Sequence, residues 1–118
     1  MEIKVGDYVR TIHGEIAIFK GWNNNSKSQW NCKLEFQKIK TWKYCCEEYI
    51  KAHSPNIIDL IEIGDYVNGF QVFKTNKQSY LDYAVMVIDG AEDGTYVFED
   101  EIKSIVTHEQ FKEMEYEV

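Results

Sequence analysis

An internal repeat constrains the fold of this chain more strongly than any other feature of its sequence. The segment IKVGDYV at residues 3–9 returns as IEIGDYV at residues 61–67, with five of seven positions identical. The segment YCCEEYIKA at residues 44–52 returns as YVFEDEIKS at residues 96–104, with four of nine identical. Because both matches occur in the same order, the sequence predicts two diverged copies of one unit. The alternative is two unrelated strand starts that share common turn chemistry.

Each copy has the pattern of several short β-strands. The eight tyrosines, six phenylalanines and three tryptophans favour strands, because aromatic side chains suit a pleated, half-buried surface. Between the two matched segments, Phe19-Lys20 can be aligned with Phe73-Lys74. We expect strands near residues 5–12, 15–22, 30–37, 41–46, 64–68, 70–75, 80–89 and 95–98.

Turn residues separate these strands. Gly6 and Gly64 can adopt positive φ, and the aspartate after each can hydrogen-bond the nearby backbone. Asn68-Gly69 between two apolar runs is a strong signal for a two-residue hairpin, and His13-Gly14 is its weaker counterpart in the first copy. Thr107 and Gln110 form a capping box, which predicts a short helix over residues 108–114.

The expected fold is mainly β, with two tandem SH3-like small barrels from an internal duplication and a short C-terminal helix. Four or five short, bent strands in about fifty residues are typical of such a barrel. The first unit spans residues 1–54 and the second spans residues 55–118. We expect Phe111 and Met114 of the helix to cover an open barrel end. One continuous twisted antiparallel sheet is the alternative architecture.

Charge is divided unevenly between the two units. The formal net charge is −7, but residues 1–54 hold nine Lys/Arg and six Asp/Glu, a net of +3. Residues 55–118 hold four Lys/Arg and fourteen Asp/Glu, a net of −10. All three tryptophans lie in the basic unit. The two units are therefore predicted to attract different partners.

Lysines alternate with large aromatic residues in the first unit. Basic residues beside stacking aromatics are a common way to bind single-stranded nucleic acid. The residues that would bind a nucleic acid or nucleotide are Lys20, Trp22, Trp30, Lys40 and Trp42. The alternative, which the sequence favours, is that the tryptophans are core residues and the lysines line a solvated edge, since strand aromatics are usually buried.

The surplus carboxylates of the second unit predict docking to a basic surface of another macromolecule. An acidic protein can present carboxylates where the phosphates of a nucleic acid would lie. The residues expected to contact the partner are Asp89, Glu92, Asp93, Glu99, Asp100 and Glu101. The alternative is that these charges only maintain solubility.

No motif for catalysis, a metal or a cofactor is recognisable, so the chain is not expected to be an enzyme. Cys32, Cys45, Cys46 and His53 do not have zinc-finger spacing, and we expect small packed residues there. Asp89, Glu92 and Asp93 lack the register of a calcium loop. His13 and His108 have no serine or cysteine partner in a recognisable arrangement.

Two segments resemble small uncharacterised proteins of clostridial phages and prophages. They are SPNIIDLIEIGDYVNG at residues 54–69 and EIKSIVTHEQF at residues 101–111. The resemblance implies a phage accessory protein that acts inside a bacterial cell. By analogy with other small acidic phage proteins, it implies binding to host machinery, including defence systems. It supplies no catalytic residues.

The leading hypothesis is therefore a non-enzymatic phage or prophage accessory protein that binds and inhibits a host macromolecule, such as a defence or nucleic-acid-processing complex. A nucleic-acid or nucleotide-binding module is the alternative, and a structural or assembly protein with homo-oligomeric contacts is the second. No cofactor and no membrane partner are expected. The odd number of cysteines and the lack of a signal-peptide pattern favour the host cytoplasm.

Overall fold

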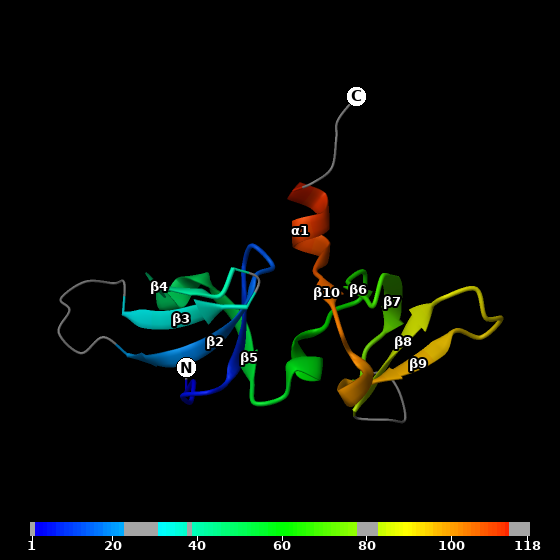
Figure 1. Cartoon of the computed structure of the whole chain (residues 1–118), viewed down its shortest axis with the longest axis horizontal. Coiled ribbons are helices and arrows are strands. Elements are labelled where there is room, and N and C mark those ends of the chain that lie inside the picture. The colour runs from blue at the N-terminus through cyan, green and yellow to red at the C-terminus, as the bar shows by residue number, and fades with distance from the viewer. Residues whose placement is uncertain (1, 23–30, 38, 78–82, 114–118) are drawn as a thin grey trace. The chain divides into compact units, whose positions relative to one another are not determined.

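The computed structural model describes residues 2–22, 31–37, 39–77 and 83–113. The chain divides into two compact units, residues 1–56 and residues 57–118, and each has its own sheet and its own hydrophobic core (Figure 1). The expectation of a mainly β fold with one short helix is confirmed.

The first unit is a five-stranded antiparallel sheet with the strand order β4-β3-β2-β1-β5 (Figure 1). Its elements are β1 Tyr8–Thr11, β2 Ile16–Trp22, β3 Cys32–Phe36, β4 Thr41–Cys45, the 3-10 helix η1 Glu47–Tyr49 and β5 Ile50–Ser54. Alternate residues of the strands point inward, as the two-residue period of a strand requires. The largest buried apolar residues of this core include Val9, Phe19, Leu34, Phe36 and Ile50.

The second unit is also a five-stranded antiparallel sheet, with the order β10-β6-β7-β8-β9. Its elements are the 3-10 helix η2 Ile57–Leu60, β6 Tyr66–Val67, β7 Phe70–Lys74, β8 Ala84–Ile88, β9 Thr95–Phe98, the 3-10 helix η3 Glu99–Glu101, β10 Ile105–Val106 and α1 His108–Glu113. Its core is mostly valine and isoleucine, and it includes Val67, Val72, Val85 and Val87.

The strands of the two units are connected in the same order. Strands β6 to β10 correspond in turn to β1 to β5, and the last strand of each unit pairs antiparallel with the first. A three-residue 3-10 helix precedes the last strand in both units. The matched sequence segments therefore occupy equivalent positions. The alternative of one continuous sheet is wrong, because the strands form two separate sheets.

The Gly-Asp turn before the first strand has the same hydrogen bonds in both units. The Asp7 carboxylate accepts the Lys4 N–H at 3.1 Å, and the Asp65 carboxylate accepts the Glu62 N–H at 2.8 Å. Gly6 and Gly64 have φ values of 96° and 95°, which favour glycine. The repeated dipeptide therefore reflects one turn geometry used twice.

The alignment of Phe19 with Phe73 is wrong by one residue. The Gly6 N–H donates to the Phe19 carbonyl, and the Gly64 N–H donates to the Val72 carbonyl, so Val72 is the counterpart of Phe19. Phe19 and Val72 are fully buried, whereas Phe73 is only half-buried. The inward face of a strand determines its register, and identity of side chains does not.

The fifth strand of each unit is absent from the strands expected from the sequence. The segments IKAHS in β5 and IV in β10 lack the clear alternation that marks a strand. The hairpin at Asn68-Gly69 is confirmed, because both residues have positive φ, 52° and 86°, between β6 and β7.

The C-terminal helix begins where the sequence predicts. The Thr107 hydroxyl accepts the Gln110 N–H, and the Gln110 side chain accepts the Thr107 N–H, both at 3.4 Å. Phe111 does not bury itself over a barrel end. Its ring stacks on Tyr66 at 4.8 Å and remains 52% exposed. Met114 lies outside the described residues.

Within the described residues, no helix has the length and apolar character needed to cross a membrane.

Candidate functional site

Three of the predicted acidic residues lie in the loop between β8 and β9. Asp89, Glu92 and Asp93 are all exposed. The Asp89 carboxylate accepts a hydrogen bond from the Thr95 side chain and another from the Ala91 N–H at 3.1 Å. Both bonds stabilise the ionised form and lower the pKa of Asp89. Asp89 therefore also organises the turn in which it lies.

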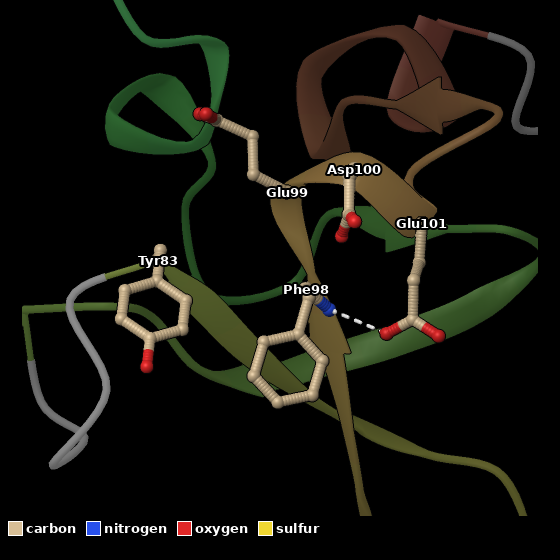
Figure 2. Close-up of a pocket in the computed structure, with 5 residues that line it drawn as sticks. All are labelled: Tyr83, Phe98, Glu99, Asp100 and Glu101. Carbon is tan, nitrogen blue, oxygen red and sulfur yellow. Dashed lines mark hydrogen bonds between the residues drawn. The ribbon is translucent and has the colours of Figure 1, made fainter.

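The other three acidic residues form η3, directly after β9. The Glu99 carboxylate accepts the Ile58 N–H at 3.1 Å, and the Glu101 carboxylate accepts the Phe98 N–H at 3.0 Å. Figure 2 shows these residues around an open pocket that Tyr83 and Phe98 also line, with the Glu99 side chain pointing away from the two rings. Asp100 is exposed.

The six acidic residues therefore form two patches. The pairing of Val87 with Thr95 lies at one end of the β8–β9 hairpin, and the pairing of Ala84 with Phe98 lies at the other. The loop carboxylates lie between Val87 and Thr95, beyond the first pair, and η3 lies beyond the second pair. Four strand residues separate the patches, which corresponds to about 13 Å. Docking of these acidic residues to a basic partner stays a prediction. Such a partner would contact either both patches or only one of them.

A β-bulge at Lys20 decides where the tryptophan of β2 lies. Phe19 pairs with Leu34, but Gly21 pairs with Lys33, so Lys20 has no partner in the pairing register of β3. The extra residue brings Trp22 opposite the buried Cys32, on the core face of the sheet. The Trp22 ring contacts Phe19 at 5.1 Å and is 40% exposed.

Trp42 lies on the opposite face of the same sheet. It pairs with Glu35 on β3, whose neighbours Leu34 and Phe36 point into the core. Tyr44 pairs with Lys33 on this outer face, and the Trp42 and Tyr44 rings meet edge to face at 5.4 Å. The Lys33 ammonium lies 4.3 Å from the centre of the Trp42 ring, a cation–π contact. We call these three residues, Lys33, Trp42 and Tyr44, the outer aromatic cluster.

The expectation that the tryptophans are core residues is wrong for Trp42, whereas Trp22 does lie on the core face of the sheet. Trp42 is 52% exposed and Tyr44 is 41% exposed. The predicted nucleic-acid set is not assembled as one site either, because Trp22 and Trp42 lie on opposite faces. Lys40 is exposed in the turn before β4, Lys20 forms an ion pair with Glu35 at 3.6 Å, and Trp30 lies outside the described residues. The alternation of the sequence TWKYC at residues 41–45 is the signal that could have paired Trp42 with Tyr44.

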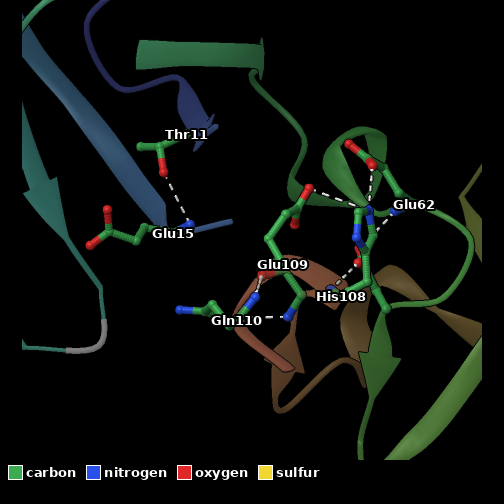
Figure 3. A network of polar contacts seen from close by, with 8 residues as sticks. Thr11, Glu15, Glu62, His108, Glu109 and Gln110 are labelled. Carbon is green, nitrogen blue, oxygen red and sulfur yellow. Dashed lines mark hydrogen bonds and ion pairs between the residues drawn. The ribbon is translucent and has the colours of Figure 1, made fainter. Parts of the chain in front are cut away.

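A third cluster joins residues that the sequence did not connect. His108 Nε2 lies 2.8 Å from the Glu62 carboxylate and 3.3 Å from the Glu109 carboxylate (Figure 3). Glu62 comes from the loop before β6, whereas His108 and Glu109 begin α1. Since 46 residues separate Glu62 from His108, no local spacing pattern could have shown this contact.

The cysteines have structural positions. Cys32 is a fully buried member of the first core, and Cys45 packs against that core from the paired strand β4. Burial, and to a smaller extent the nearby Glu47, raises the pKa of the Cys32 thiol to about 11. Burial also raises the pKa of Cys45. Thiols with raised pKa values are poor metal ligands and poor nucleophiles near neutral pH.

No protein-family model, curated protein sequence or solved structure matches this chain.

Proposed function

We propose that this chain is a non-enzymatic binding protein made of two SH3-like barrel units that descend from one duplicated ancestor. The strand order supports this architecture. In both units the last strand follows a 3-10 helix and pairs with the first strand of a five-stranded antiparallel sheet, the order expected if each sheet curls into a small barrel.

We further propose that the first unit binds single-stranded nucleic acid through the outer aromatic cluster. The observation that carries this proposal is the exposure of Trp42 and Tyr44 beside Lys33 on one sheet face. Exposed aromatic rings supply stacking platforms for bases, and lysine supplies charge for the phosphates. The net charge of +3 in this unit favours an anionic ligand.

The edge position of the cluster favours an extended ligand. Strand β4 is the end strand of the first sheet, so Trp42 and Tyr44 lie beside a sheet edge. Lys40 is exposed in the turn before this strand, whereas Lys43 pairs with Leu34 and lies on the other face, 5.8 Å from the centre of the Phe36 ring. A flexible single strand can follow such an edge and stack successive bases, whereas a rigid duplex offers no free base faces.

The phage resemblance of residues 54–69 and 101–111 suggests where such binding would matter. In a bacterial host cell, a phage accessory protein that holds single-stranded nucleic acid would compete with host complexes that process it. Inhibition of a defence or nucleic-acid-processing complex is therefore compatible with this ligand.

Affinity for labelled single-stranded oligonucleotides tests the proposal. Base–aromatic stacking contributes about 1–3 kcal/mol per base, so Trp42→Ala and Tyr44→Ala should each weaken binding by roughly 5- to 150-fold. Tyr96→Ala is the matched control, because Tyr96 is the equivalent of Tyr44 in the acidic unit and is 37% exposed. We expect Tyr96→Ala to bind as the unmodified protein does.

Salt dependence gives a second measurement. Lys33→Gln should reduce the slope of log affinity against log salt concentration by about 0.7, the value for one phosphate contact on a single strand. If Trp42→Ala and Tyr96→Ala bind equally well, or if the unmodified protein does not bind at low salt, the proposal is wrong.

Docking of the second unit to a basic protein is a second candidate function. The observation in its favour is the exposure of Asp89, Glu92 and Asp93 in one loop of a unit with a net charge of −10. Capture of partners from host lysate should then be lost in the triple variant Asp89→Asn, Glu92→Gln, Asp93→Asn and at high salt. Capture that is equal in the triple variant would contradict it.

A further inference from the structure

The cluster of Glu62, His108 and Glu109 has the composition of a metal-ion site. One imidazole nitrogen and two carboxylate oxygens lie within 4.8 Å of one another. A mixed nitrogen and oxygen set suits divalent transition metals, whereas magnesium and calcium prefer oxygen alone.

The distances are close to those that a zinc ion requires. Zinc binds histidine nitrogen and carboxylate oxygen at about 2.0–2.2 Å, so two ligand atoms in a tetrahedral site are about 3.3 Å apart. The distance from His108 Nε2 to Glu109 is already 3.3 Å, and the distance to Glu62 is 2.8 Å. A small rotation of one carboxylate would therefore admit the ion.

The backbone that carries these ligands is held by one buried carboxylate. Asp65 has no exposed surface. One of its oxygens accepts the Glu62 N–H at 2.8 Å, and the other accepts the His108 N–H at 2.9 Å. The two segments that supply the ligands are thus fixed to each other before any ion binds, which lowers the cost of assembling the site.

The cluster is also partly open to solvent. The side chains of His108, Glu62 and Glu109 are 41%, 33% and 17% exposed. An ion could therefore enter, and a fourth position would remain for water or an anion. In the first unit, Lys4 occupies the position of Glu62, so a cation there would meet a positive charge.

We propose that Glu62, His108 and Glu109 bind one divalent transition-metal ion of the zinc type. The ion would connect the loop before β6 to the start of α1. This site is specific to the second unit and is independent of the nucleic-acid surface proposed for the first.

Titration of the full chain with Co²⁺ tests the site, because cobalt replaces zinc and reports its ligands by absorption. We expect one equivalent to bind, with d–d bands in the visible and without the near-ultraviolet charge-transfer band of thiolate ligands. Glu62→Gln and His108→Gln should each weaken binding at least tenfold. Both variants keep hydrogen-bonding side chains, and circular dichroism will show whether they remain folded.

His53→Gln is the matched control, because His53 faces Asp7 of the equivalent turn at 3.6 Å in the first unit. We expect His53→Gln to bind cobalt as the unmodified chain does. Three results would overturn the proposal: no bound cobalt, a thiolate band in the spectrum, or unchanged binding in folded His108→Gln. In those cases the cluster is an ion pair that fixes the start of the helix.

Discussion

At the scale of single residues, the two Gly-Asp turns show how one carboxylate organises a local structure. Asp7 and Asp65 occupy the same position, but Asp65 is more deeply buried and also accepts the His108 N–H. Loss of an acceptor leaves buried N–H groups without a partner, which costs more than the bond contributed.

We predict that Asp65→Ala lowers the free energy of unfolding of the second unit by about 3–5 kcal/mol, because two backbone donors lose a charged acceptor. Asp7→Ala should cost the first unit less, about 1–3 kcal/mol, since one backbone bond to Lys4 is lost. Urea unfolding followed by far-ultraviolet circular dichroism measures both. Equal losses would contradict the bridging role of Asp65.

The contribution of the exposed Asp89 carboxylate to the stability of its turn should depend weakly on pH. Its pKa lies below the ordinary value of 3.8, first because of the Thr95 hydroxyl and then because of the Ala91 N–H. The stabilisation is complete above the unfolded-state pKa and is lost as pH falls through the lower folded-state pKa. We expect Thr95→Val to raise the pKa of Asp89 towards 3.8 in a carboxyl titration followed by NMR. An unchanged pKa would exclude the Thr95 bond.

The Cys32 thiol should be inert in the folded protein. With a pKa of about 11, roughly one thiol in a thousand is ionised at pH 8, and its side chain has no exposed surface. We expect iodoacetamide to leave Cys32 unmodified until urea unfolds the first unit, as measured by peptide mass analysis. Rapid labelling of Cys32 in native buffer would contradict its burial.

At the scale of elements, the hairpin turn between β6 and β7 is tied to the end of the unit. The Asn68 side chain accepts the Lys103 N–H at 2.7 Å and the Ser104 N–H at 3.2 Å, and it donates to the Glu101 carbonyl at 3.0 Å. A turn residue thus holds the segment between η3 and β10.

We predict that Asn68→Ala lowers the free energy of unfolding by about 2–3 kcal/mol, because it loses these bonds and strains a backbone at a φ of 52°. Asn68→Gly loses the same bonds but accepts positive φ, so it should cost about 1 kcal/mol less than Asn68→Ala. Chemical denaturation of both variants measures the difference. Identical stabilities would show that backbone strain at this turn is unimportant.

A structural feature could be predicted from the sequence when the interacting residues are close together in the chain. Turns such as Asn68-Gly69 and the helix cap at Thr107 depend on neighbours in the chain, and both were predicted correctly. The placement of Trp22 and Trp42 on opposite faces of the sheet was not predicted. The bulge at Lys20 shifts the alternation of β2 by one residue and brings Trp22 to the core face. The Glu62–His108 contact depends on the tertiary fold and had no local signal.

At the scale of the whole molecule, the two separate cores predict two separately measurable unfolding events. All three tryptophans lie in the first unit, so their fluorescence reports on that unit alone. Leu34 and Val87 are equivalent buried residues, one in each core. Truncation of a buried leucine to alanine costs about 2–5 kcal/mol because it leaves a cavity.

We therefore predict that Leu34→Ala shifts the fluorescence-detected unfolding midpoint to lower urea concentration, whereas Val87→Ala leaves it unchanged. Val87→Ala should instead shift the transition detected by hydrogen exchange of the second unit. If Val87→Ala shifts the fluorescence midpoint as far as Leu34→Ala does, the chain unfolds as one cooperative body.

The shared turn has a consequence for how this chain can change over time. Its hydrogen bonds join a backbone N–H to one aspartate carboxylate, so the turn does not depend on which side chains lie on the outward faces of the strands. One unit can therefore carry surplus lysines and the other surplus carboxylates while both keep the same turn. For the same reason, new binding surfaces could be designed on either unit independently.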